Sequence, residues 1–350
     1  MGNVFKENGD MKINDYREAY EILKSHRNLE EASLASGIPK TTLYERSKKY
    51  EAYLSSSDEK TYEVQEHVPD DIPITEVVDH LHKRFQQKKK SKESKKWIKI
   101  KMKSNKPIGL LWLGDPHIDD KYCDWDSLRR DLDVIKSSEN IYGCSLGDYQ
   151  NNWIGRLSRL YGEQETSHKT AWRLVEWLIE EMNPMILIGG NHDMWSGAGD
   201  PLKWMTKPHT ILEDWEARIQ LDFPNGTHCR IHAAHDMPGH SQFNPLHAQG
   251  KMAQKLSTAD LYISGHRHNW ALSHMELVEQ EKTCWLARAR GYKYHDTFAH
   301  VKGFEQQKFG QSIMQIIDPQ RSLNQTAHVQ CYSDSVEGSR YLEYLSSLQP

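Results

Sequence analysis

The stretch IGLLWLGDPH, residues 108–117, decides the fold of this 350-residue chain. Six apolar or small residues run without polar alternation, which predicts a strand buried on both faces, as in a parallel sheet. Helical periodicity follows in residues 124–138 and again in residues 166–182. Similar apolar runs return in IYGCSLGD (141–148), MILIGGNHD (185–193), HCRIHAAHD (228–236) and DLYISGHRHN (260–269). Alternating strands and helices predict an α/β domain.

Polar residues gather where these apolar runs end, which is where α/β sheets bind ligands. Mixed His and Asp ligands suit Mn, Fe or Zn, whereas an all-carboxylate site would suit Mg or Ca. Where two ions of this kind lie about 3.5–4 Å apart, they can activate a water molecule as the nucleophile and neutralise the negative charge of a phosphoryl group. The motifs are GDPH (Asp115, His117), GDYQN (Asp148, Asn151), GNHD (Asn191, His192), AAHD (His235) and GHRH (His266, His268).

These five motifs, in this order and 33, 43, 44 and 31 residues apart, resemble those of the calcineurin-like metallophosphoesterase superfamily across roughly residues 107–275. The resemblance implies a two-sheet α/β sandwich, two divalent metal ions and hydrolysis of phosphate esters. Mn²⁺ is the expected ion, with Fe, Zn or Ni as alternatives. The layout is also similar to metallophosphoesterases of bacteriophages and prophages, and the GNHD form is shared with DNA-repair exonucleases, cyclic-nucleotide phosphodiesterases and small phosphomonoesterases.

The resemblance also implies a role for each motif residue. A water made acidic by both metals would attack the phosphorus in line with the leaving group, and His192 would stabilise the transition state or protonate the leaving oxygen. The first metal would be held by Asp115, His117, Asp148 and His268, and the second by Asn191, His235, His266 and the bridging Asp148.

One ligand has a nearby rival, because His232 and His235 lie three residues apart on the same segment. His235 is preferred, since it ends the apolar run and precedes a loop. His232 is followed by two alanines that still belong to the predicted strand.

The chain departs from the protein Ser/Thr phosphatases of the superfamily, which carry GDxxDRG and GNHE. Asn151 and Asn152 stand in place of that Asp and Arg, and Asp193 replaces the Glu. The phosphate-clamping Arg and the orienting partner of His192 are thus missing at those positions, which argues against a phosphoprotein phosphatase. Orientation of His192 would fall to Asn151 or to another group.

Two further segments each allow two interpretations. The loop 235–247 places His240, Ser241, Asn244 and His247 either on the substrate or in hydrogen bonds of the loop itself. The segment RARGYKYHDTFAHVKGF, residues 288–304, either lines the phosphate side of the groove or forms a surface strand.

The N-terminal region has a different pattern. Residues 15–26 have helical spacing, and NLEEASLASG (28–37) offers Asn28 as an N-cap, Glu31 as a capping-box acid and Gly37 as a stop. KTTLYERSKKY (40–50) then predicts a basic third helix. This pattern resembles the small helix-turn-helix modules of recombinases and transposase-like proteins. A plain three-helix bundle for protein contacts is the alternative.

If the module binds DNA, the third helix enters the major groove. Thr and Lys side chains would contact phosphates, and Arg46 is the best candidate for a base edge. The predicted DNA-binding residues are Lys40, Thr41, Thr42, Arg46, Lys48 and Lys49.

Charge divides the rest of the chain. Residues 51–79 are acidic and contain two prolines, whereas residues 83–106 carry twelve Lys or Arg against one acid and are predicted to form a helix and then a strand from near Trp97. This basic stretch is either a solvated linker or a collar for a phosphodiester backbone. The predicted organisation is a module at 12–50, an acidic then basic linker at 51–106, a catalytic domain at 107–323 and a polar tail at 324–350.

Composition narrows the class of protein. Apolar residues make up 37% and charged residues 27%, which fits neither collagen, nor a coiled coil, nor a low-complexity chain. With no apolar run long enough for a membrane span or a signal peptide, we expect a cytoplasmic protein with no membrane partner. Five cysteines without a CxxC pair are expected to be reduced.

The sequence favours a phosphoesterase acting on nucleic acid, as a DNA nuclease or a DNA-end phosphatase. One alternative is a phosphodiesterase or phosphatase for a nucleotide or other small molecule. The other is a DNA-binding regulator whose phosphoesterase domain is inert, which is disfavoured because each matched ligand position has a ligand-capable side chain. Oligomeric state is left open.

Overall fold

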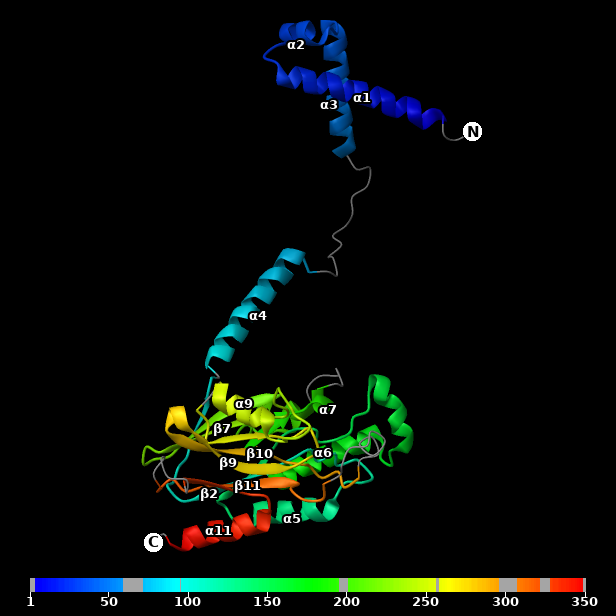
Figure 1. Ribbon diagram of the computed structural model, residues 1–350. Helices are drawn as coiled ribbons and strands as arrows, with labels where there is room; N and C mark the ends of the chain where they lie inside the picture. Colours follow the sequence, from blue (N-terminus) through cyan, green and yellow to red (C-terminus); the bar gives the residue numbers. More distant parts are fainter. Residues whose placement is uncertain are drawn as a thin grey trace. The chain divides into compact units, whose positions relative to one another are not determined.

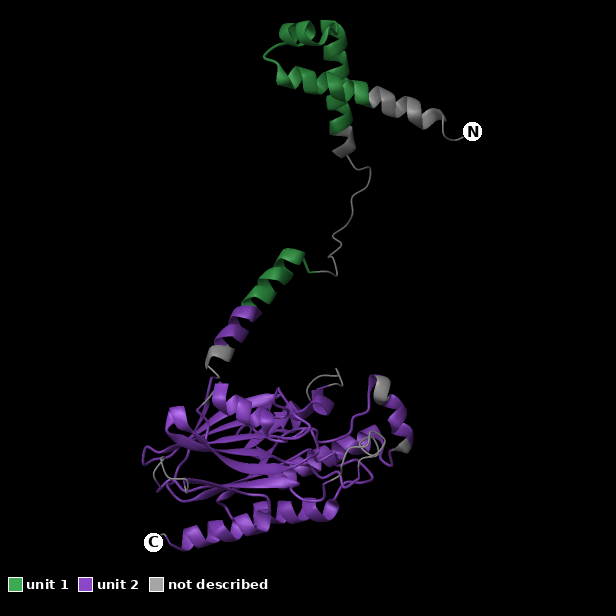
Figure 2. Ribbon diagram, in the orientation of Figure 1, with its two compact units in different colours: residues 1–83 green, residues 84–350 purple. Residues whose placement is uncertain are grey.

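A computed structural model describes residues 4–58, 72–94, 96–194, 201–255, 258–295, 307–321 and 328–348. The chain divides into two compact units, residues 1–83 and 84–350 (Figure 2). The acidic segment predicted as linker lies partly outside the described residues, at 59–71. No described helix combines the length and apolar character that crossing a bilayer would require.

The first unit contains the three expected helices, α1 (Val4–Ser25), α2 (Leu29–Ser36) and α3 (Lys40–Asp58) (Figure 1). The Asn28 side chain caps α2 by accepting from the Glu31 N–H, and Gly37 ends α2 at φ 70°. Helix α3 continues eight residues past the predicted boundary at 50, because no Gly or Pro interrupts it. The small core shared by the three helices is Ala19, Ala32 and Leu43.

Helix α4 (Ile74–Ser94) spans the boundary between the two units. From residue 74 to residue 90 its side chains are exposed except for the half-buried Val77, as expected for so highly charged a helix. The basic run predicted from the sequence therefore presents cations to solvent at Lys83, Arg84, Lys88, Lys89 and Lys90.

The second unit is built on two six-stranded sheets. The first has the order β1 (Ile98–Lys101), β6 (Glu216–Asp222), β7 (His228–Ala234), β8 (Leu261–Ser264), β10 (Lys282–Arg288), β9 (Ala271–Leu277). The second has the order β12 (Val329–Tyr332), β11 (Ser312–Ile317), β2 (Ile108–Leu113), β3 (Ile141–Ser145), β4 (Ile186–Gly189), β5 (Ile211–Asp214). In the second sheet the neighbours β2, β3, β4 and β5 pair in parallel. In the first sheet β8 pairs in parallel with both β7 and β10.

The sheets face one another across the main hydrophobic core, which includes Leu110, Ile188, Ile231 and Ile263. Helices α5 (Trp125–Lys136), α6 (His168–Met182) and α11 (Ser335–Ser347) cover the outer face of the second sheet, and α9 (His247–Lys255) covers that of the first (Figure 1). The predicted two-sheet α/β sandwich is confirmed. Short helical segments are α7 (Asn191–Met194), α8 (Pro201–Met205), η1 (Gly155–Glu163) and η2 (Val278–Gln280).

The second unit contains elements on both sides of the predicted catalytic domain, 107–323. Strand β1 lies inside the predicted linker but pairs with β6, because Ile98 and Ile100 alternate with lysines and pack on the core. Strand β12 and helix α11 lie inside the predicted polar tail, yet they bury Val329 and Leu342. In both segments the apolar residues are few but have strand or helix spacing. Residues 324–327 and 349–350 of that tail lie outside the described residues.

Asp131 of α5 ties the C-terminal segments to the sandwich. It is fully buried, and it accepts hydrogen bonds from Tyr292 Oη at 2.6 Å, Ser312 Oγ at 2.7 Å and Ser335 Oγ at 2.6 Å. One carboxylate thus joins the segment after β10, the start of β11 and the start of α11.

We expect Asp131→Ala to lower the free energy of unfolding by about 3 kcal/mol, because buried hydroxyls would lose a charged acceptor. Asp133→Ala on the exposed side of the same helix should change it by less than about 0.5 kcal/mol. Urea unfolding of the two variants measures the difference, and equal midpoints would contradict the role of Asp131.

Candidate metal centre

The seven predicted metal ligands meet at one edge of the sandwich. Asp115, Asp148 and Asn191 follow the carboxyl ends of β2, β3 and β4 in one sheet, and His235 and His266 follow β7 and β8 in the other. His117 and His268 lie two residues beyond Asp115 and His266. Parallel strands that end at a common edge bring residues distant in sequence together.

The Asp148 carboxylate is at the centre of this cluster. Its Oδ2 lies 3.3 Å from His235 Nε2, 4.0 Å from His266 Nδ1 and 3.9 Å from His192 Nε2. Its Oδ1 accepts a hydrogen bond from the His192 N–H at 2.9 Å. Asn191 completes this side, with Oδ1 2.9 Å from His235 Nε2. A bridging position for Asp148 fits these distances.

The Asp115 carboxylate also lies close to histidines of the cluster. Its Oδ1 lies 3.6 Å from His235 Nδ1, and its Oδ2 lies 3.8 Å from His268 Nε2. Oδ2 also accepts from the His266 N–H at 2.7 Å. The ring centroids of His117 and His268 are 5.1 Å apart.

Two triplets of donors are compact enough to hold one ion each: His117, Asp148 and His192 in one, and Asp148, His235 and His266 in the other. Several buried donor atoms here have no hydrogen-bond partner among the described residues. They are Asp115 Oδ1, His117 Nδ1, His117 Nε2 and His266 Nδ1. Buried polar atoms are rarely left unpaired, and divalent ions would satisfy these. The donor set therefore fits two divalent ions.

Burial and neighbouring charges shift the pKa values of the cluster residues in different directions. Burial raises the pKa of Asp115 and lowers the pKa of His117 well below its usual range. Burial would also raise the pKa of Asp148, but the charge and hydrogen bond of His235 hold it well below its ordinary value. Against the effect of burial, Asp148 and Asp115 raise the pKa of His235 to about 10. Asp148 is thus ionised, and His235 carries its counter-charge.

The backbone at the centre is strained. His117, Asp148, His266 and His268 all have φ between 41° and 67°, a left-handed region that costs about 1–3 kcal/mol for residues with a side chain. Gly190 allows the strand ends to approach, because a Cβ there would overlap Asp148 Oδ1. Strain held at several neighbouring positions is typical of functional sites.

Asp193 braces this strained turn. Its Oδ2 accepts from the N–H groups of Asp148 and Gly190, both at 2.8 Å, and its Oδ1 accepts from the Tyr149 N–H at 3.1 Å. Asp119 acts similarly, accepting from the Asn151 N–H at 2.7 Å. Neither residue had a predicted role, although Asp193 is adjacent to His192 and Asp119 lies two residues after His117.

His192 lies beside Asn151, its predicted orienting residue. The carbonyl oxygen of Asn151 accepts a hydrogen bond from His192 Nδ1, which directs Nε2 toward Asp148. The Asn151 side chain instead donates to Asp120 Oδ2 at 3.0 Å. The orienting group is therefore a main-chain carbonyl, which a side-chain motif cannot show.

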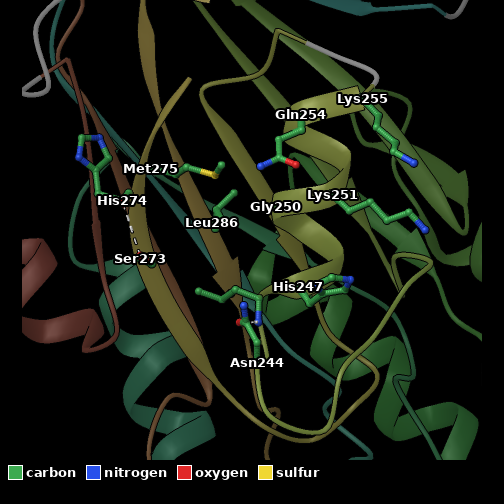
Figure 3. A pocket seen from close by; sticks show the side chains of 11 residues that line it. Asn244, His247, Gly250, Lys251, Gln254, Lys255, Ser273, His274, Met275 and Leu286 are labelled. Carbon is green, nitrogen blue, oxygen red and sulfur yellow. Dashed lines mark hydrogen bonds between the residues drawn. The ribbon is translucent and has the colours of Figure 1, made fainter. Parts of the chain in front are cut away.

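His232 lies apart from the centre, buried on β7 with Nε2 3.6 Å from Glu216 Oε2. The described part of the predicted segment 288–304 is not a surface strand, because Arg288, Arg290 and Tyr292 are buried, and its residues 296–304 lie outside the described residues. Asn244 and His247 line a separate cavity of about 560 Å³ between α9 and β9, with Lys251, His274 and Met275 (Figure 3). None of the predicted metal ligands lines that cavity.

The predicted DNA-binding residues lie on α3. Thr41, Lys48 and Lys49 are exposed, whereas Thr42 is half-buried. Lys40 pairs with Glu30, and Arg46 Nη2 lies 3.9 Å from Asp15 Oδ2 on α1. Arg46 is therefore partly engaged within the unit.

No protein-family model and no curated protein matches this chain. Similar solved structures include the NAD nucleotidase NadN of Haemophilus influenzae, at 11% identity and a TM-score of 0.36 over 65% of this chain and 49% of that chain. This chain thus matches about half the length of NadN. Vps29 of Chaetomium thermophilum matches at 13% identity and 0.33, over 64% and 92%, respectively. The protein of unknown function AQ665 from Aquifex aeolicus matches at 17% identity and 0.24, over 45% and 78%.

Metal binding should release a proton from His235. Its raised pKa means that its protonated form stabilises the metal-free fold fully below its unfolded pKa near 6.5, and that this stabilisation is lost as pH rises through about 10. At pH 7.5 the His must lose that proton to become a ligand. Calorimetric titration with Mn²⁺ in buffers of different ionisation enthalpy should show about one proton more released than in His235→Asn. Equal release from both proteins would contradict this role.

Proposed function

We propose that this protein is a two-metal phosphoesterase of the calcineurin-like superfamily that hydrolyses phosphate esters of nucleic acid. The observation that carries the proposal is the position of Asp148 at the sandwich edge, where His117 on one side and His235 and His266 on the other place donor atoms within 4.8 Å of its carboxylate. Unpaired buried donors around it favour bound divalent ions over an inert cluster of polar residues.

The chain's own residues have separable tasks. When bound, the two ions would activate a water molecule and neutralise charge on the phosphoryl group. Asp148 lies between the histidine donors predicted for the two ions. His192 directs Nε2 into the site and is placed to give a proton to the leaving oxygen, and the Asn151 carbonyl maintains this orientation.

Nucleic acid is favoured as substrate by features outside the sandwich. Helix α3 presents Thr41, Lys48 and Lys49 to solvent, and α4 presents an exposed basic run. Clustered cations on helices attract a phosphodiester backbone through counterion release. The reaction is proposed as a DNA nuclease or a DNA-end phosphatase, in which the first unit contacts duplex DNA.

The first test is hydrolysis of end-labelled single-stranded and duplex DNA by the full chain with Mn²⁺. We expect metal-dependent cleavage or removal of an end phosphate. Asp148→Ala should lose both metals and all turnover while it still binds DNA, because the bridging carboxylate is gone. Metal analysis, hydrolysis and a DNA-binding assay are read on the same samples.

Retained turnover in Asp148→Ala would contradict the bridging role. If the wild-type protein leaves DNA intact but hydrolyses a small phosphodiester, the substrate is a small molecule or RNA. DNA binding without any metal-dependent hydrolysis would favour a regulator.

The second test concerns α3. Lys48→Ala should weaken DNA binding and reduce the slope of log affinity against log salt by about 1, because one phosphate contact is lost. Lys24→Ala on α1 is the matched control, since each lysine is exposed and lies over a tyrosine ring. Hydrolysis of a small chromogenic phosphodiester should be unchanged in both variants. Identical salt slopes for the two would exclude Lys48 from the DNA contact.

A further inference from the structure

Lys293 is fixed beside the metal centre by the main chain around it. The Tyr292 N–H donates to the Asp115 carbonyl at 3.0 Å, and the Tyr294 N–H donates to the Tyr122 carbonyl at 2.8 Å. Between them, Lys293 forms an isolated bridge with Cys123. The segment that follows β10 therefore runs along the loop after β2, which carries the first metal ligands.

The Lys293 side chain is held in a defined place. Only 9% of its surface is exposed, and Nζ lies 3.2 Å from Asp120 Oδ2. Nζ also lies 5.3 Å from the centroid of the Trp153 ring, and that ring is 5.3 Å from the His192 ring. The ammonium thus lies against an acid and an aromatic ring, and that ring in turn contacts the predicted catalytic histidine.

The charge of Lys293 acts on the metal centre itself. Burial is the main cause of the lowered pKa values of His117 and His192, and the nearby ammonium lowers both further. A cation at this place has an electrostatic cost next to two divalent ions. It becomes favourable when an anion lies between the cation and the ions.

A phosphate ester is such an anion, and the residue in the place of the family's clamping Arg is not available to bind it. Asn152 is buried, and its side chain already donates to the His192 carbonyl at 2.6 Å and contacts His168 Nε2 at 3.3 Å. We propose that Lys293 binds a non-bridging oxygen of the substrate phosphate. The phosphate subsite consists of Lys293 over the Trp153 ring, and Asp120 is the competing acid beside it.

The contact with Asp120 does not use all the donors of the ammonium. An ammonium has three donors, and the contact with Asp120 needs one of them. Asp120 Oδ2 also accepts from Asn151 Nδ2 at 3.0 Å, so the phosphate subsite is joined to the residue whose carbonyl orients His192. One bound phosphate would contact Lys293 while its leaving oxygen faces His192. This inference rests on the phosphoesterase part of the proposed function and not on the nucleic-acid part.

The test measures the affinity of inorganic phosphate for the full chain loaded with Mn²⁺, by calorimetry. Lys293→Met keeps the apolar stem over Trp153 and removes the charge, so phosphate should bind about tenfold to a hundredfold more weakly. Mn²⁺ content should stay unchanged, because Lys293 is not a ligand. Lys293→Arg should recover part of the affinity, and the KM for a small phosphodiester should follow the same order.

Two variants separate phosphate binding from a purely structural ion pair. Lys121→Met is the matched control, since Lys121 is an exposed lysine over the Tyr122 ring in the same loop, and it should bind phosphate like the wild type. Asp120→Asn keeps an acceptor for Asn151 and removes the acid that competes for Lys293. Phosphate should therefore bind Asp120→Asn as tightly as the wild type or more tightly.

The outcomes distinguish this inference from the proposed function. Equal phosphate affinity in Lys293→Met and Lys121→Met, with ester hydrolysis intact in the wild type, would overturn the inference alone. An equal loss in Lys293→Met and Asp120→Asn would make the ion pair structural and also overturn it. A wild-type protein that takes up neither Mn²⁺ nor phosphate would overturn both.

Discussion

One buried carboxylate governs the rest of the structure, because Asp148 has to stay ionised where burial would neutralise it. Burial disfavours the charge, and His235 opposes that effect through its own charge and a hydrogen bond. The price of this arrangement is visible in the backbone, where Asp148 takes a left-handed conformation that Asp193 braces with three hydrogen bonds. Packing of the two sheets is needed to bring His235, which follows β7, beside Asp148, which follows β3.

The sandwich explains how such a centre is tolerated. Two packed sheets and their covering helices bury a large apolar core, and hydrophobic burial of that size offsets a few kcal/mol of local strain. The strained residues all lie just beyond strand ends, where the chain leaves the regular ladder. Rigid strands fix the positions of the segments that follow them, and the predicted metal ligands lie on those segments.

Much of the fold followed from residue patterns, and the errors have a common cause. The apolar runs at 108–113 and 141–145 and the periodic helices between them were recognisable because each is long and uninterrupted. Strand β1 was predicted to start near Trp97 but not to belong to the sandwich, and helix α11 was missed, since a few apolar residues among lysines or serines resemble a solvated segment until a partner is present. Pairing with β6 and packing on α5 and β11 supply that partner, and neither is encoded locally.

The sequence by itself determined which side chains are available for the site: the Asp, Asn and His residues of five short motifs, each placed at the end of an apolar run. It also determined that cations are concentrated in residues 83–106. Only the tertiary structure decided which atoms act. It set His235 rather than His232 in the cluster, gave the orientation of His192 to a main-chain carbonyl and brought Lys293 to Asp120 across 173 residues of chain. The physical reason is that strand spacing fixes where residues leave a sheet, whereas the meeting of loops depends on how two sheets pack.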